Sequence, residues 1–216
     1  GSFATSAETF CKALFLGGVT RRFPDLNFSF MEGGAGWARN LYSDLVGHWE
    51  KRNLEALENV DPKNLDMARL ADFVEEFGGP LLKDRAGEIR DAKDVTQFDA
   101  RKDDGVIDTA LIDDWAKSGI KRREDIYERF VPNFYFGCEA DDPMTAGAFK
   151  TNENPMQAKL RVMYGSDIGH WDVFQMNETL EEAYEMVEDG LIDKDDLRDF
   201  LFTNTATLHA GMNPNF

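Results

Sequence analysis

The sequence has few basic residues for its acidic content. Of its 216 residues, 24 are Lys or Arg and 41 are Asp or Glu, so the formal net charge is −17 at pH 7. Nucleic acids and anionic membrane surfaces attract proteins through a basic face. The charge balance therefore argues against a nucleic-acid partner and against a membrane-surface partner.

Cysteine and histidine are also scarce. Cys11 and Cys138 lie far apart in the chain, and only three histidines occur. Two distant thiols do not form a disulfide framework, so we expect a reduced, cytoplasmic setting. A structural zinc site of the Cys/His type needs about four such ligands at close spacing, and the sequence excludes one.

Long apolar runs are missing as well. No stretch of about 18 apolar residues occurs, so no transmembrane helix is expected. The opening residues, GSFATSAETFCKALF, lack the basic segment that begins a secretory signal peptide. The composition is nevertheless 42% hydrophobic and 12% aromatic, which is enough for a core. We expect a single domain over residues 1–216.

Three segments have the composition of β-strands. Each is rich in large apolar or aromatic residues and is followed by glycines or acidic residues. They lie near residues 26–32 (LNFSFME), 133–139 (NFYFGCE) and 161–167 (RVMYGSD). Strands that alternate with helices predict an α/β fold with parallel strands.

Helical patterns separate and follow these strands. A long apolar face runs from Trp37 to about Leu57, and several short helices are expected as a helical insertion over about 58–130. Thr179 and Glu182 have the spacing of a capping box, which predicts a helix start near the carboxyl terminus.

Acidic residues stand at the end of each predicted strand. Glu32 precedes GGAG, Glu139 precedes ADDP, and Asp167 lies within YGSDIGHWD. In barrels of alternating strands and helices, the chemistry occurs at the carboxyl ends of the strands. Convergence of these carboxylates in one pocket would favour an enzyme, whereas separate surfaces would favour an interaction domain.

The segments FPDLNFSFMEGGAGW and YGSDIGHWD, which occur in this order, resemble two motifs of the amidohydrolase superfamily. The similar branch contains aminocarboxymuconate-semialdehyde decarboxylase and γ-resorcylate decarboxylase. RRFPDLNFSFMEGG resembles the sixth strand of its (β/α)8 barrel, NFYFGCEADDP the seventh and RVMYGSDIGH the eighth, while FLFTNTATLHAGMNP resembles the closing segment. The resemblance implies the C-terminal portion of a TIM barrel, and a metal-dependent hydrolase or decarboxylase that acts on a small carboxylate, lactone or amide substrate.

The resemblance also implies roles for particular residues. Asp167 takes the place of the family's eighth-strand aspartate and is expected to contact the metal or the attacking water. Glu32 stands where the family has a sixth-strand histidine, and it would carry a proton or contact the substrate. His170 would line the rim. The implied cofactor is one divalent ion, zinc first and manganese as the alternative.

The chain departs from the family in its histidines. It has no His-x-His pair and no counterpart of the fifth-strand histidine. We therefore expect a fragment of a larger barrel, or a chain that associates with the missing part or with a second copy as a dimer. Alone, it would carry an incomplete metal site.

Other interpretations of the same residues stay open. Asp167 and His170 could cap a turn between glycines, and Glu32 could bond the backbone of GGAG. Trp37 and Trp171 are expected to be packing residues. As a second hypothesis, the chain is a non-catalytic α/β interaction domain that dimerises through its aromatic-rich helices, such as the one at 37–57.

Overall fold

The computed structural model describes residues 2–58, 60, 64–90, 113–213 and 215–216 of the chain. Contacts divide the chain into two compact units, which we call the sheet unit, residues 1–50 with 115–216, and the helical unit, residues 51–114. The sheet unit contains the three strands found among the described residues, and all three candidate site residues.

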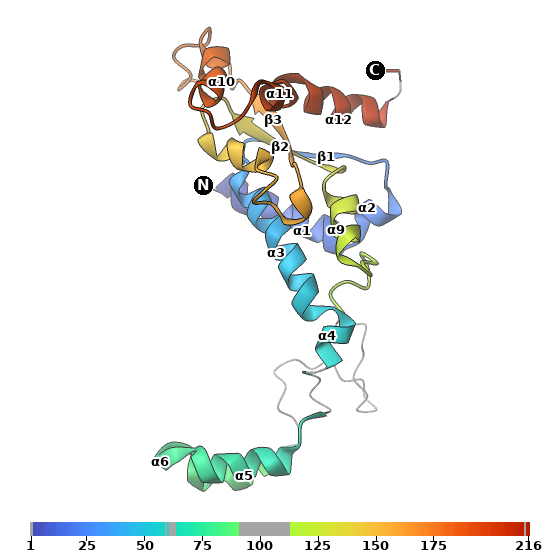
Figure 1. Cartoon of the computed structure of the whole chain (residues 1–216), viewed down its shortest axis with the longest axis vertical. Coiled ribbons are helices and arrows are strands. Elements are labelled where there is room, and N and C mark those ends of the chain that lie inside the picture. The colour runs from blue at the N-terminus through green and yellow to red at the C-terminus, as the bar shows by residue number, and fades with distance from the viewer. Residues whose placement is uncertain (1, 59, 61–63, 91–112, 214) are drawn as a thin grey trace. The chain divides into compact units, whose positions relative to one another are not determined.

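A three-stranded parallel sheet forms the centre of the sheet unit (Figure 1). Its order is β1-β2-β3, with bounds β1 Phe28–Phe30, β2 Phe134–Glu139 and β3 Arg161–Gly165. Phe28 pairs with Phe134, and Tyr135 pairs with Arg161. The sheet is open, and each strand lies within the range predicted for it. The expected α/β fold with parallel strands is therefore confirmed.

Helices precede and follow the strands of the sheet unit. They are α1 Ser2–Leu16, α2 Val19–Arg22, α3 Gly36–Arg52, α9 Arg123–Phe130, α10 Thr179–Glu188, α11 Lys194–Arg198 and α12 Asn204–Met212. Two 3₁₀ segments, η3 Pro143–Phe149 and η4 Pro155–Gln157, lie between β2 and β3, and a π-helical turn at Asp199–Thr203 joins α11 to α12.

An aromatic cluster fills one face of the sheet. Phe30, Phe134 and Phe136 project from the strands and are at most 7% exposed. The ring of Phe130 from α9 lies 5.0 Å from that of Phe134, and Trp37 from α3 lies 5.3 Å from Phe136, between ring centroids. Burial of each such side chain stabilises the fold by about 2 kcal/mol. This cluster holds the strands in register beneath the site.

The opposite face of the sheet is covered by the carboxyl-terminal helix. Tyr135 and Met163 point to this side and pack with Leu208 of α12. The side-chain amide of Asn204 donates a hydrogen bond of 2.8 Å to the carbonyl of Val162. Both faces are thus buried, as parallel sheets require, and Figure 1 shows α12 on the side away from α1 and α3.

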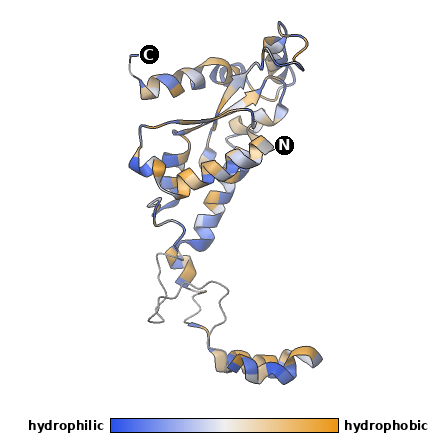
Figure 2. Ribbon diagram, turned by 180° about the vertical axis from the view of Figure 1, so that it is seen from behind, coloured by the Kyte–Doolittle hydropathy of each residue, from blue (hydrophilic) through white to orange (hydrophobic). Residues whose placement is uncertain are grey.

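The described residues of the helical unit form four short helices. They are α4 Leu54–Glu58, α5 Met67–Phe77, α6 Gly79–Leu82 and α7 Ala86–Arg90, with a 3₁₀ turn at Lys83–Arg85. Asp66 caps α5 by accepting a hydrogen bond of 3.0 Å from the backbone N–H of Arg69. Figure 2 shows apolar and polar residues alternating along α5, as in an amphipathic helix.

The predicted helical insertion over about 58–130 overlaps this unit, and its residues 59, 61–63 and 91–112 lie outside the described ones. Among the described helices, none combines the length and the apolar character needed to cross a bilayer.

Candidate metal centre

The loops after β1 and β3 each begin with a left-handed residue that is not glycine. Glu32 has φ 59° and Asp167 has φ 52°, and each stands two residues beyond its strand. Such a conformation costs about 1 kcal/mol or more for a residue with a Cβ. Strain of this kind concentrates at functional sites.

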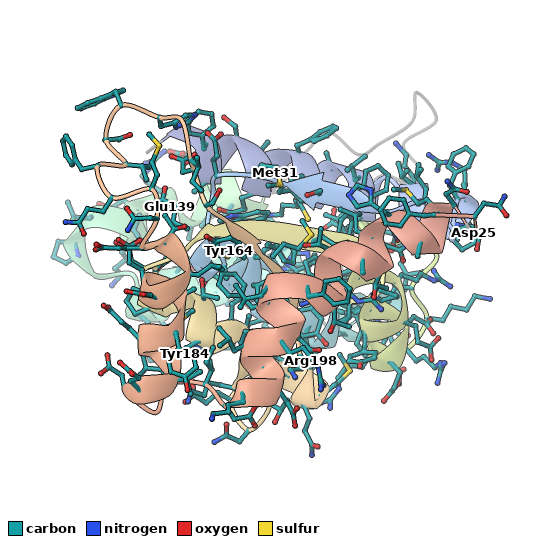
Figure 3. The ribbon with its side chains drawn as sticks, turned by 90° about the horizontal axis from the view of Figure 1, so that it is seen from above. Asp25, Met31, Glu139, Tyr164, Tyr184 and Arg198 are labelled. Atoms are coloured by element: carbon teal, nitrogen blue, oxygen red, sulfur yellow. The ribbon has the colours of Figure 1, made fainter. Side chains whose placement is uncertain are left out.

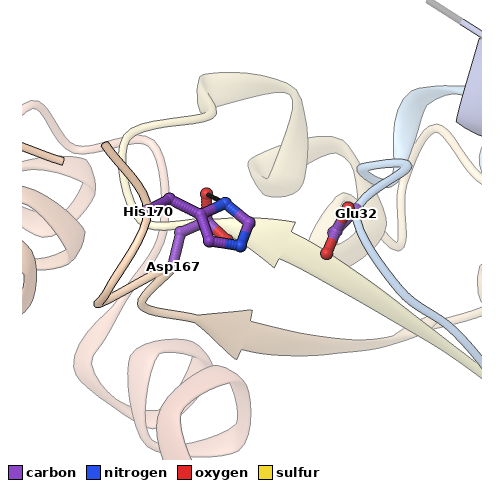
Figure 4. Close-up of side chains that lie close together, drawn as sticks. All are labelled: Glu32, Asp167 and His170. Atoms are coloured by element: carbon purple, nitrogen blue, oxygen red, sulfur yellow. Dashed lines mark ion pairs between the residues drawn. The ribbon is translucent and has the colours of Figure 1, made fainter. Parts of the chain in front are cut away.

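The side chains of Glu32, Asp167 and His170 converge at the carboxyl end of the sheet (Figure 4). Each offers one ligand atom, and the three atoms lie within 4.8 Å of one another. Nδ1 of His170 is 2.8 Å from Oδ2 of Asp167. The structure therefore brings together all three residues that the sequence singled out, and we call them the triad.

A tight turn explains why Asp167 and His170 meet. The backbone N–H of His170 donates to the carbonyl of Asp167 at 3.1 Å, and Gly169 takes a φ of 107° within the turn. Ser166 takes part in the same turn, since its hydroxyl accepts a hydrogen bond of 3.4 Å from the Ile168 N–H. The segment D-x-x-H thus forms a turn that brings the side chains of Asp167 and His170 together.

The donor set of the triad fits a divalent cation. One imidazole nitrogen with two carboxylates is a combination that zinc and other first-row metals accept, and a catalytic zinc keeps a position open beside three protein ligands. Ligand atoms of a tetrahedral zinc lie about 3.4 Å apart. The spread of up to 4.8 Å therefore requires movements of about 1 Å.

Partial exposure makes such movements feasible. The side chains of Asp167 and His170 are 33% and 56% exposed, and Glu32 is exposed. None of the three is locked in the packed core, so each can rotate toward a common ion. The same exposure gives an ion an entry path from solvent.

A second group of carboxylates lies beside the triad, around the end of β2. Glu139, the last residue of β2, lines an open pocket of about 390 Å³ together with Asp141, Asp167, Asp172 and Glu182. We call this hollow the acidic pocket. Figure 3 shows Glu139 next to the loop that leaves β3. Asp167 belongs to both the triad and the pocket.

The carboxylates of the acidic pocket repel one another. Burial raises the pKa of Glu139, and the negative charges of Asp141 and Asp167 raise it further, as do those of Asp142 and Asp172. No lysine, arginine or histidine stands among the described residues that line the pocket. Its negative potential is therefore not neutralised by the pocket's own side chains, and such a potential attracts cations.

Sequence reasoning identified some of these residues and missed others. Glu139 was expected at a strand end, and it shares the pocket with Asp167, whereas Glu32 reaches Asp167 without lining the pocket. Asp172 and Glu182 were missed. The one available signal was the density of acids after the second and third strands.

The expected packing roles of the two tryptophans differ in outcome. Trp37 packs against Phe30 and Phe136, as expected. Trp171 is 86% exposed, so the expectation that it packs in the interior is wrong. Its loop carries it out over the surface beside the site.

Comparison of the chain with protein-family models, with curated protein sequences and with solved structures gave no match.

Proposed function

We propose that this chain carries part of the active site of a metal-dependent hydrolase or decarboxylase that resembles the amidohydrolases. The observation that carries the proposal is the convergence of the triad. Glu32 comes from the loop after β1, and Asp167 and His170 come from the loop after β3, yet their ligand atoms lie within 4.8 Å. Independent segments that bring metal-binding groups together are typical of active sites.

The order of the strands supports the finer fold assignment. Consecutive strands of a (β/α)8 barrel are neighbours and parallel, whereas a doubly wound sheet reverses its order part-way. The order here is sequential, β1-β2-β3. It is the order that three adjacent barrel strands would have, and it fits the proposal of a C-terminal barrel portion.

The triad residues would hold the ion, with zinc favoured by the donor set and manganese as the alternative. A bound ion of this kind supplies a polarised substrate oxygen or a water with lowered pKa. Asp167 orients the imidazole of His170 through the contact at 2.8 Å. Asp167 also faces the acidic pocket, where it can contact a bound substrate.

Glu139 is the residue best suited to handle a proton. Burial and neighbouring negative charges raise its pKa, so it keeps a proton at a higher pH than an ordinary glutamic acid. A carboxyl with a raised pKa can donate that proton to a leaving nitrogen or oxygen. The pocket volume of about 390 Å³ is that of a small-molecule site.

The second hypothesis, an interaction domain that dimerises through the helix at 37–57, stays a prediction. Its proposed surface is already occupied, because Leu41, Tyr42 and Leu45 of α3 are at most 3% exposed within the sheet unit. These side chains stabilise the core and are not available to a partner. The observation favours the enzyme.

The first test is the binding of zinc to metal-free protein. We expect about one equivalent in a calorimetric titration, with an increase in Tm, because a ligand at 100 times its Kd stabilises the folded state by about 2.7 kcal/mol. Asp167→Asn should weaken the binding by at least about 10-fold, since even residues that only orient a metal ligand contribute about 10- to 100-fold to affinity. Glu185→Gln on α10 is the matched control, since Glu185 is exposed and lies outside both triad and pocket.

Because the chain is proposed to carry only part of the active site, we expect it to be inactive by itself. Activity is therefore tested on small lactones, amides and carboxylates with the zinc-loaded chain joined to the part of the barrel that the resemblance implies. We expect both Asp167→Asn and Glu139→Gln to lose hydrolysis or decarboxylation, and Glu139→Gln to retain zinc binding. This result would support a metal-binding role for Asp167 and a proton-donating role for Glu139. Zinc binding that is equally strong in wild type and in a variant lacking all three triad side chains would contradict the proposal.

A further inference from the structure

The acidic pocket contains more negative charge than one metal ion accounts for. If Asp167 is assigned to the ion, four carboxylates of the lining remain, those of Glu139, Asp141, Asp172 and Glu182. The described lining offers no cationic side chain to balance them. An anionic substrate group would enter against this field, whereas a cationic group would be drawn in.

The loop between β3 and α10, part of which lines the pocket, gives a second, independent observation. The loop between β3 and α10 exposes Ile168, Trp171, Phe174 and Met176, and the two aromatic side chains are 86% and 87% exposed. Phe174 itself lines the pocket. Large apolar side chains gathered at the surface beside a cavity mark a binding site. Aromatic faces also attract organic cations.

We propose that the substrate of this site carries a protonated amine attached to an apolar group. This inference rests on the proposed function and narrows its substrate class. The ammonium lies among Asp172, Glu182 and Glu139, and the apolar group lies against Phe174, which lines the same pocket. The bond to be cleaved then faces Asp167 and the triad, because Asp167 lines the pocket on that side. A lactone or an amide that bears an amine satisfies this arrangement, and a simple carboxylate does not.

Three probes of equal size isolate the effect of charge: benzylammonium, benzyl alcohol and benzoate. Their binding is followed by the shifts of backbone amide signals from residues 165–175 in 150 mM NaCl at pH 7, with and without zinc. We expect saturable binding of benzylammonium at least about 10-fold tighter than that of either other probe, as two nearby carboxylates would produce.

Pocket variants locate the probe. The double variant Asp172→Asn with Glu182→Gln should weaken the binding of benzylammonium by about 10-fold. Phe174→Ala should weaken it by about 3-fold, the size of an exposed cation–π contact. Glu185→Gln removes one charge from the same helix as Glu182 but outside the pocket, so it should leave the affinity unchanged. Circular dichroism checks that each variant is folded.

Three outcomes would overturn the inference. One is binding of benzoate as tight as that of benzylammonium, and another is affinity for benzylammonium that the pocket variants do not change. The third is a zinc titration with two equivalents in which the second displaces benzylammonium, since the pocket would then be a second metal site. Absence of zinc binding is read separately and counts against the proposed function.

Discussion

Two acidic regions of the sheet unit behave in opposite ways. At the start of α9, the pKa of Asp125 is lowered, whereas at the carboxyl end of the sheet the pKa of Glu139 is raised. Both carboxyls experience burial, which raises a pKa. They differ in their neighbours, because donors and cations surround Asp125 and other acids surround Glu139. One region uses its charge to stabilise the fold, and the other maintains charge at a cost in stability.

The contacts of Asp125 show how its charge is used. Its carboxylate accepts hydrogen bonds from the backbone N–H groups of Lys121, at 2.9 Å, and Arg122, at 3.2 Å. The Arg122 guanidinium donates to it at 2.9 Å. These contacts outweigh the burial that raises its pKa, so the net pKa is lowered. A carboxylate that accepts several donors at a helix start is a strong cap.

The largest effect on stability is expected for Asp125→Asn. The amide removes the charge from these contacts, and we expect a loss of about 1–2 kcal/mol in the free energy of unfolding at pH 7. Because the pKa of Asp125 is lower in the folded state, its contribution is present above the unfolded pKa of about 3.9 and is lost as the pH falls through the folded value. Urea unfolding at pH 7 and at pH 3 measures both.

Glu128→Gln is the control on the same helix. Its carboxylate pairs with Arg122 at 2.7 Å, but both side chains are more than half exposed, so the loss should be a few tenths of a kcal/mol. If Asp125→Asn were as mild as this control, the contrast between the two acidic regions would not hold.

Local sequence patterns predicted the sheet well. The three strands were identified because aromatic and apolar residues concentrate in short runs bounded by glycines and acids, and β2 is buried along most of its length. The helix predicted over 37–57 was identified by its periodic apolar face and is found in part, because α3 ends at Arg52 and a second helix, α4, follows at Leu54–Glu58. Such signals belong to a single segment and need no knowledge of the rest of the fold.

Signals that depend on tertiary contacts were less reliable. Thr179 and Glu182 have the spacing of a capping box, yet α10 has Glu178 at its N-cap position and no side-chain cap. The hydroxyl of Thr179 instead accepts a hydrogen bond of 2.7 Å from the hydroxyl of Tyr164. A half-buried tyrosine from β3 thus replaced the local cap, which no local pattern reveals.

In the candidate site, too, local patterns predicted what lies close in sequence and missed what depends on tertiary contacts. Asp167 and His170 are neighbours in sequence, and the turn that joins them was visible as a motif between glycines. Their approach to Glu32 depends on the parallel pairing of β1 and β3 with β2, which brings the strand ends to one side. The sequence could propose this from the acidic residues at the predicted strand ends and from the resemblance, and neither gives the distances between the side chains. Glu182 comes from a helix, so its place in the pocket depends on how α10 packs.

The strain at Glu32 offers a second test of the comparison. Glu32→Gly should raise the free energy of unfolding of the metal-free protein by about 0.5–1 kcal/mol, because glycine takes a φ of 59° without strain. The same change removes a triad ligand and should weaken zinc binding. A gain in stability coupled to a loss of affinity is the result expected where strain is maintained for function.

A glycine in an unstrained place is the matched control. Glu185→Gly lies within α10 and should lower stability by about 1 kcal/mol, as glycine does in helices. If Glu32→Gly were destabilising to the same extent, the left-handed residue would be supported by its own contacts and would not be a source of strain.

The smallest effect is expected for Glu139→Gln, and its sign is the opposite of that for Asp125→Asn. Because the pKa of Glu139 is raised in the folded state, ionisation of this carboxyl lowers stability as the pH rises from the unfolded pKa of about 4.3 through the folded value. Glu139 is exposed, so solvent screening limits the gain from the amide to a few tenths of a kcal/mol at pH 7.

Salt provides the decisive comparison for Glu139. The gain from Glu139→Gln should shrink as NaCl is raised from 0.05 M to about 1 M, since a Debye length of about 3 Å screens the repulsion from neighbouring acids. The hydrogen bonds of Asp125 are short and partly buried, so the loss from Asp125→Asn should change less over the same range. A stabilising Glu139 carboxylate would mean that a cation already balances it, and the pocket would then have no charge left to attract an amine.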